Sequence, residues 1–183
     1  MQAAMEPGSR AARVALAGLA EAVEEREGTT VFRVEPRRLR EAAARLREAG
    51  YTYLLSISGV DEPKQERIRI VYHFTRPDSP GEVVALETAV PRGEPRVPSI
   101  SSIYPAALYQ EREEHEMLGI EFEGLPDTRH LLLPEDWPAG VYPLRRDYRV
   151  PDEPFMAPRQ SKPLEELRRR AADGAGEGQQ TGG

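Results

Sequence analysis

The residues best suited to chemistry form an unbroken polar run, Gln110 to Glu116, with four carboxylates, one arginine and one histidine. Residues four apart on a helix are neighbours, so Glu111 would lie near His115 and Arg112 near Glu116. Helices that are polar all round are either exposed or bridge to another body. The run therefore predicts either a solvated helix face or a polar contact surface for another protein.

Metal binding and acid–base catalysis are the chemical alternatives for this run. Glu111 and His115 could share an ion, but a di-iron site needs Glu-x-x-His on two helices, and a zinc-protease motif needs a second histidine. Glu111 and Glu113 could serve as general acid and base in a hydrolase. The sequence places them in no pocket, and it has no Gly-rich phosphate loop or nucleophile elbow. We therefore expect no catalytic residue, no metal ligand and no cofactor-binding residue.

Composition excludes several classes of protein. The 183 residues suffice for one domain plus tails, and the net charge of −6 argues against a nucleic-acid partner. No apolar run approaches the roughly 20 residues that span a bilayer, and the N-terminus lacks a signal-type apolar core. The absence of cysteine excludes disulfides and cysteine-ligated iron–sulfur clusters. We expect a cytoplasmic protein that reaches a membrane only through a partner.

The apolar pattern predicts an α+β domain over residues 1–123. Strands joined by short turns favour an antiparallel sheet, against which helices would pack in two layers. Expected helices are Ala11–Arg26, Pro36–Ala49 and Pro105–Leu118, and expected strands are Thr29–Val34, Tyr51–Val60, Arg67–Phe74 and Val83–Val90. In these strands, Tyr53, Leu55 and Ile57 should share one face, as should Ile68, Ile70, Tyr72 and Phe74.

Residues 124–160 are dense in proline and glycine, which predicts an extended, Pro-rich C-terminal segment. Gly119 should end the preceding helix in a left-handed conformation, and Gly124 should permit the turn into the segment. Leu131–Leu133 and Trp137 would act as anchors in a partner or cover the domain's own core. Residues 161–183 should hold a short charged helix and a disordered tail.

Between Ser99 and Tyr148, several short motifs follow one another at fixed spacing. They are Glu111-Arg112-Glu113, Glu116-Met117-Leu118-Gly119-Ile120, Phe122-Glu123-Gly124, Pro126-Asp127, Arg129 with Leu131-Leu132, and Pro143-Leu144-Arg145-Arg146-Asp147-Tyr148. This stretch resembles the signature of the 30 kDa subunit family of respiratory complex I, NADH:quinone oxidoreductase. The run from Leu131 to Pro138 also resembles relatives in energy-converting membrane-bound hydrogenases.

The resemblance implies a non-catalytic structural subunit of the hydrophilic arm, peripheral on the cytoplasmic face of the cell membrane. It would dock the hydrogenase-like large subunit near the quinone-reducing end, beside neighbouring iron–sulfur subunits. NADH, FMN, iron–sulfur clusters and quinone would belong to those partners. Candidate interface residues are Glu111, Arg112, Glu113, Glu116, Gly119, Gly124, Asp127, Arg129, Leu132, Trp137, Pro143, Arg145 and Asp147.

Two other functions stay open. One is the equivalent subunit of an energy-converting membrane-bound hydrogenase, which co-purifying partners would distinguish. The more remote one is a free-standing acid–base hydrolase that uses Glu111 and Glu113.

Overall fold

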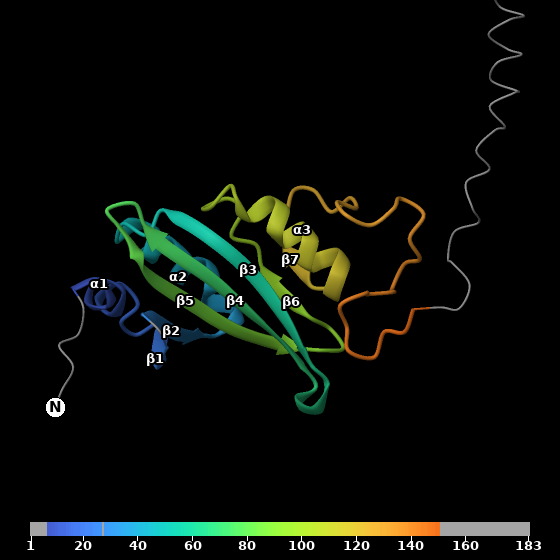
Figure 1. Ribbon diagram of the computed structural model, residues 1–183, viewed down its shortest axis with the longest axis horizontal. Helices are drawn as coiled ribbons and strands as arrows, with labels where there is room; N and C mark the ends of the chain where they lie inside the picture. The colour runs from blue at the N-terminus through green and yellow to red at the C-terminus, as the bar shows by residue number, and fades with distance from the viewer. Residues whose placement is uncertain (1–6, 27, 151–183) are drawn as a thin grey trace, which may run out of the picture.

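The computed structural model describes residues 7–26 and 28–150 (Figure 1). Residues 124–150 follow the last strand without a helix or strand of their own. Residues 151–160 and the helix and tail expected over 161–183 lie outside the described residues. The elements in chain order are α1 (Pro7–Ala15), β1 (Ala20–Arg26), β2 (Thr29–Val34), η1 (Pro36–Arg38), α2 (Leu39–Glu48), β3 (Tyr53–Glu62), η2 (Pro63–Gln65), β4 (Arg67–Arg76), β5 (Ser79–Pro91), β6 (Arg96–Pro98), α3 (Ala107–Leu118) and β7 (Glu121–Glu123).

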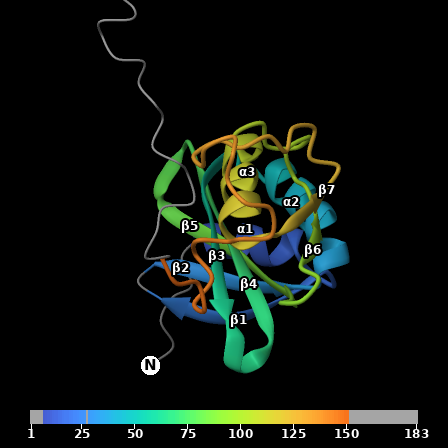
Figure 2. The same ribbon diagram turned by 90° about the vertical axis from the view of Figure 1, so that its right-hand side faces the viewer.

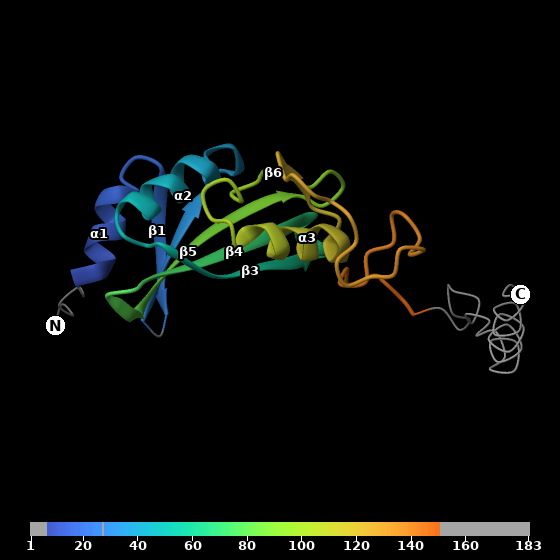
Figure 3. The same ribbon diagram turned by 90° about the horizontal axis from the view of Figure 1, so that it is seen from above.

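A five-stranded sheet forms one layer, with strand order β1-β2-β5-β4-β3. Helices α1, α2 and α3 lie together on one face of this sheet (Figures 2 and 3). The alternation of β4 is as predicted, because its four apolar residues of one face are all fully buried: Ile68, Ile70, Tyr72 and Phe74. They pack in a single core with the apolar residues of the helices. The predicted α+β class is confirmed.

The sheet is mixed, whereas the short turns predicted an antiparallel one. Strand pairs β1–β2, β3–β4 and β4–β5 are antiparallel, but β2 and β5 run parallel. Short turns constrain only strands that follow one another, and α2, β3 and β4 lie between this pair in the chain. A second parallel pair, β6–β7, joins residues on either side of α3 and buries Val97 and Phe122.

The first helix is shorter than predicted. Helix α1 ends at Ala15, and Gly18 adopts φ +74, a left-handed conformation that stops a helix. Residues 20–26, expected to be helical, form β1, because pairing with β2 outweighs a weak local helical pattern. Leu16 and Leu19, in the turn after the helix, are buried, whereas Val14 is 71% exposed.

Strand β3 also departs from its predicted alternation. The register shifts between Leu54 and Ser56, so an extra residue changes which side chains face the core. Ile57 is buried, but Tyr53 and Leu55 are 60% and 50% exposed. The predicted shared face of these three residues is therefore wrong.

Helix α3 begins at Ala107, two residues later than predicted, ends at Leu118 as predicted, and packs against β3. It ends at Gly119, whose φ of +76 confirms the expected left-handed stop. The helix lies close to β3 at Gly59. A Cβ atom on that residue would overlap Cδ1 of Leu118 and Oε2 of Glu114.

This close approach predicts that Gly59→Ala weakens the packing of α3 on β3. We expect a loss of about 1–3 kcal/mol in the free energy of unfolding, because the added methyl group overpacks the contact and the buried ends of Leu118 and Glu114 must move. Urea denaturation would measure it. Gly81→Ala is the matched control, since a Cβ there meets no atom within 4 Å. Equal stability of the two variants would contradict the contact.

Candidate functional site

The polar run of α3 is mostly buried, so the interpretation as a solvated helix face is wrong. Glu111 is 0% exposed, Glu116 5%, Glu114 8% and Arg112 9%, whereas Glu113 is exposed. These side chains are covered by other parts of the chain, among them the sheet on one side of α3 and the C-terminal segment 124–150 on another. The contacts described below show that these charged groups bind other parts of the same chain.

Glu111 fixes the loop that leads into α3. Its carboxylate accepts hydrogen bonds from the Ser99 hydroxyl at 2.5 Å and from the Ile100 backbone N–H at 2.8 Å. Burial raises the pKa of Glu111 to about 6, although these bonds favour the charged form. His115, its expected neighbour, instead places Nδ1 2.8 Å from the Ile120 carbonyl oxygen. Within the described residues, no group of three or more metal-binding side chains is arranged around an ion site.

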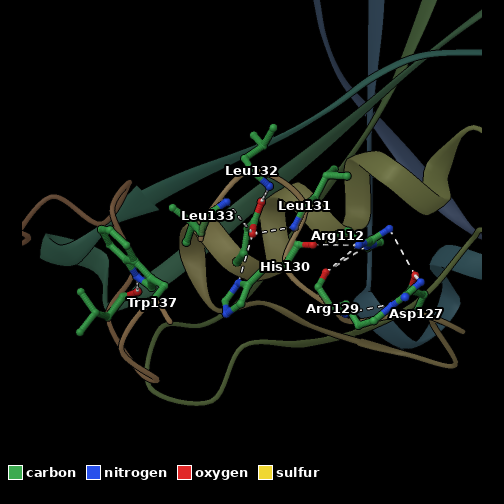
Figure 4. Close-up of polar contacts among 10 residues, drawn as sticks. Arg112, Asp127, Arg129, His130, Leu131, Leu132, Leu133 and Trp137 are labelled. Carbon is green, nitrogen blue, oxygen red and sulfur yellow. Dashed lines mark hydrogen bonds and ion pairs between the residues drawn. The ribbon is translucent and has the colours of Figure 1, made fainter. Parts of the chain in front are cut away.

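Arg112 binds the start of the C-terminal segment (Figure 4). Its guanidinium donates to the Arg129 carbonyl from Nε and Nη2, at 3.1 and 2.8 Å, and to the His130 carbonyl at 3.1 Å. Nη1 also lies 3.3 Å from Asp127. Asp127 in turn accepts two bonds from the side chain of Arg129, and these together with Arg112 keep its pKa well below its usual range.

Glu116 organises the next three residues. Its carboxylate accepts the backbone N–H groups of Leu131, Leu132 and Leu133 at 3.0, 2.7 and 3.3 Å. His130 Nδ1 lies 3.3 Å away. Burial alone would raise the pKa of Glu116, but the hydrogen bonds outweigh it and the pKa is lowered. A single carboxylate thus fixes the backbone that carries the three leucines.

The end of the segment returns to the C-terminal end of α3. Arg145 Nε donates to the Leu118 carbonyl at 2.9 Å, and the Leu144 N–H donates to the Met117 carbonyl at 3.1 Å. The Tyr142 ring lies so close to Gly119 that a Cβ there would overlap it. Glycine is therefore required at this position both by its left-handed conformation and by the ring.

A second buried carboxylate, Asp61 at the end of β3, holds the segment beyond Arg145. It accepts both Nε and Nη2 of Arg92, at 2.7 and 3.1 Å, and the backbone N–H of Arg146 at 2.8 Å. Arg92 also donates to Asp147 at 2.7 Å. The bonds from Arg92, followed by that from Arg146, keep the pKa of Asp61 below its ordinary value. Nothing in the local sequence pointed to Asp61 or Arg92.

These contacts divide the predicted interface residues into two groups. The first group has its polar or backbone atoms engaged within the chain and comprises Glu111, Arg112, Glu116, Gly119, Asp127, Arg129, Arg145 and Asp147. The second group, Glu113 and Leu132, has exposed side chains.

The remaining predicted interface residues shape the segment itself. Trp137 and Pro143 are half-buried, and the Trp137 indole donates to the Val141 carbonyl at 2.9 Å. Gly124 has φ +85 and permits the expected turn. Contact with a partner stays a prediction for all of these residues.

Large apolar side chains remain at the surface of the segment. Leu132 is 60% exposed, Leu144 58% and Leu131 38%. Figure 1 shows the segment, in orange, at the end of the molecule opposite α1. The arrangement presents leucines on a backbone that buried charges hold in place. None of the described helices is long and apolar enough to cross a membrane.

The chain is similar in sequence to subunits of respiratory enzymes. A family model described as respiratory-chain NADH dehydrogenase, 30 kDa subunit, matches residues 32–154. An NADH-quinone oxidoreductase subunit of Moorella thermoacetica is 36% identical over 104 residues, which cover 57% of this chain and 68% of that protein. An F(420)H(2) dehydrogenase subunit of Methanosarcina mazei is 40% identical over 98 residues, covering 54% and 61%.

A solved structure is similar over most of the chain. It belongs to the membrane-bound sulfane sulfur reductase, an archaeal respiratory membrane complex. The likeness has a TM-score of 0.71 at 27% identity, and it covers 91% of this chain and 92% of that one.

The geometry of Glu116 predicts the effect of Glu116→Gln. We expect a loss of about 1–3 kcal/mol in stability and faster amide exchange at 131–133, because a neutral amide oxygen replaces a charged acceptor. Since the pKa of Glu116 is lowered, its contribution is present above its ordinary value of 4.5 and is lost as pH falls. Hydrogen exchange would measure it. Glu135→Gln, at an exposed position of the same segment, should change nothing; matching exchange in both variants would refute the role of Glu116.

Proposed function

Because this chain belongs to the 30 kDa subunit family of the respiratory-chain NADH dehydrogenase, we propose that it is a structural subunit of a membrane-associated respiratory oxidoreductase. In this proposal the chain is non-catalytic and lies in the hydrophilic arm on the cytoplasmic face of the membrane. It docks the hydrogenase-like large subunit near the quinone-reducing end. NADH, flavin, iron–sulfur clusters and quinone are held by partner subunits.

One observation carries this proposal: the buried charges of α3 bind the backbone of segment 124–150. Arg112 and Glu116 together hold residues 129–133 through carbonyl and N–H groups. The side chains of the leucines are left free to contact something else. A catalytic helix would need its carboxylates to face a substrate, whereas these are used to shape a surface.

The shaped surface suits protein docking. An exposed leucine that becomes fully buried at an interface gains roughly 1.5–3 kcal/mol. Holding the segment in one conformation beforehand reduces the entropy lost on association. Leu132 and Leu144 would act as the anchors, and the exposed charges of Glu113 and Arg129 would lie at the rim.

The hydrolase alternative finds no support in the geometry. Glu111 is fully buried and its carboxylate is bonded to Ser99 and Ile100, whereas Glu113 is exposed. The two carboxylates do not face a common solvent-accessible site, so they cannot act together on one substrate.

A second candidate is the same structural role in a related membrane complex with a different electron donor or acceptor. The likenesses to an F(420)H(2) dehydrogenase subunit and to the sulfane sulfur reductase support this second candidate. The equivalent subunit of an energy-converting hydrogenase is another case of the same structural role. The chains that co-purify from native membranes would separate these parents, since NADH-binding subunits accompany only the first.

The docking role predicts that Leu132→Asp releases the subunit from its complex without unfolding it. A charge at an apolar anchor should weaken binding by about tenfold or more, because it would have to be buried without a partner. The measurement is co-purification of the large subunit, identified by mass spectrometry, with the tagged full chain from native membranes.

Val14→Asp is the matched control, since Val14 is also exposed, at 71%, but lies on α1 at the opposite end of the molecule. Both variants should keep the thermal stability of the parent chain. Full recovery of the complex with Leu132→Asp would overturn the proposal.

A further inference from the structure

Glu114 is a buried carboxyl group that the docking surface does not use. It lies on α3 where the helix meets Gly59 of β3. Its Oε2 atom is buried and accepts no hydrogen bond from any described residue. One turn earlier, Gln110 accepts the backbone N–H of Ile57 at 2.6 Å. Gln110 and Glu114 thus both lie against β3, an edge strand of the sheet.

A second polar group in this region is also unsatisfied. Tyr72 of β4 is fully buried, and its hydroxyl has no hydrogen-bond partner among the described residues. Burial raises the pKa of this phenol, and the charges of Glu111 and Glu114 raise it further. Tyr72 and Glu114 are thus two buried polar groups of this region, and the charge of Glu114 acts on the tyrosine hydroxyl.

The surroundings of Glu114 provide no counter-charge among the described residues. The titratable or charged groups that face it are Glu111 and Glu113 on its own helix and Tyr72 on β4, and β3 contributes the Gly59 backbone. Arg40 acts on Glu111, whereas the one charge that acts on Glu114 is that of the exposed Glu113. Burial raises the pKa of Glu114 to about 7, and a backbone hydrogen bond from Gly59 opposes this only in part.

We propose that α3 carries a proton-linked latch: Glu114 holds the helix on β3 as a neutral carboxylic acid, and its ionisation loosens the helix. A neutral carboxylic acid can occupy this apolar space at a modest cost, whereas a carboxylate there would remain a buried charge with no cation beside it. Because the opposite side of α3 binds segment 124–150 through Arg112 and Glu116, loosening the helix also loosens the segment.

The direction of the pH effect follows from the raised pKa. The latch is fully closed below the ordinary value of 4.5, and its contribution is lost as pH rises to about 7. Between these values the equilibrium constant for opening should rise by up to about tenfold per pH unit, because one proton is released on opening. The latch is a property of the chain itself and does not depend on the identity of the partner.

The test is amide hydrogen exchange of the full chain at pH 5, 6, 7 and 8, corrected for the intrinsic exchange rate at each pH. We compare the chain with Glu114→Gln, which has nearly the same shape but cannot ionise. The ratio of protection in the variant to that in the parent chain, over α3 and residues 131–133, should grow at least about tenfold from pH 5 to pH 7. Because Glu111 titrates in both, it cancels in this ratio.

Glu135→Gln is the matched control, since it removes an exposed carboxylate that does not act on Glu114. Its protection should follow that of the parent chain at every pH. Carbon-13 NMR of the Glu114 carboxyl provides a second readout in the unaltered chain and should show a midpoint near pH 7. A protection ratio that does not change with pH, or a carboxyl already ionised at about pH 5.5, would overturn the latch.

Discussion

The shape of the C-terminal segment depends on one interaction, the burial of the Glu116 carboxylate among three consecutive backbone N–H groups. A buried carboxylate is stable only if its lost hydration is replaced, and an irregular backbone likewise needs partners for its N–H groups. Each satisfies the other here. Arg112 does the same for two carbonyl groups a few residues earlier, and Asp61 for the N–H of Arg146. The segment can therefore follow a fixed path with no helix or strand, while its leucines point outward.

The carboxyl groups around α3 fall into two electrostatic classes. Glu116 and Asp61 work as anions, and hydrogen bonds from N–H and guanidinium groups lower their pKa values. Glu114 has no cation beside it among the described residues, and burial raises its pKa to about 7. The first class weakens in acid, and the second weakens as pH approaches neutrality. The contacts on the two sides of α3 should therefore be strongest together in mildly acidic solution, where Glu116 and Asp61 are still ionised and Glu114 is still protonated.

Sequence patterns predicted the parts of the fold that depend on neighbours in the chain. The alternation of β4 and the stop of α3 at Gly119 are examples, because each follows from local geometry. The patterns failed where distant pairing decides: β1 is drawn into the sheet by β2, and an extra residue in β3 exposes Leu55. The burial of Glu116 was missed for the same reason, because the N–H groups that it binds lie 15 to 17 residues later, in a loop. The bond from Arg146 to Asp61 joins residues 85 positions apart, and no local pattern indicates it.

The central claim is that segment 124–150 is a preformed surface that contacts a large partner subunit. Photo-crosslinking tests it most directly: a photoreactive amino acid replaces Leu132 in one chain and Val14 in another, and each is irradiated in native membranes. The account predicts that position 132 captures the hydrogenase-like large subunit, identified by mass spectrometry, and that position 14 does not. Capture of that subunit from position 14 alone, or from neither position while the chain remains in its complex, would contradict it.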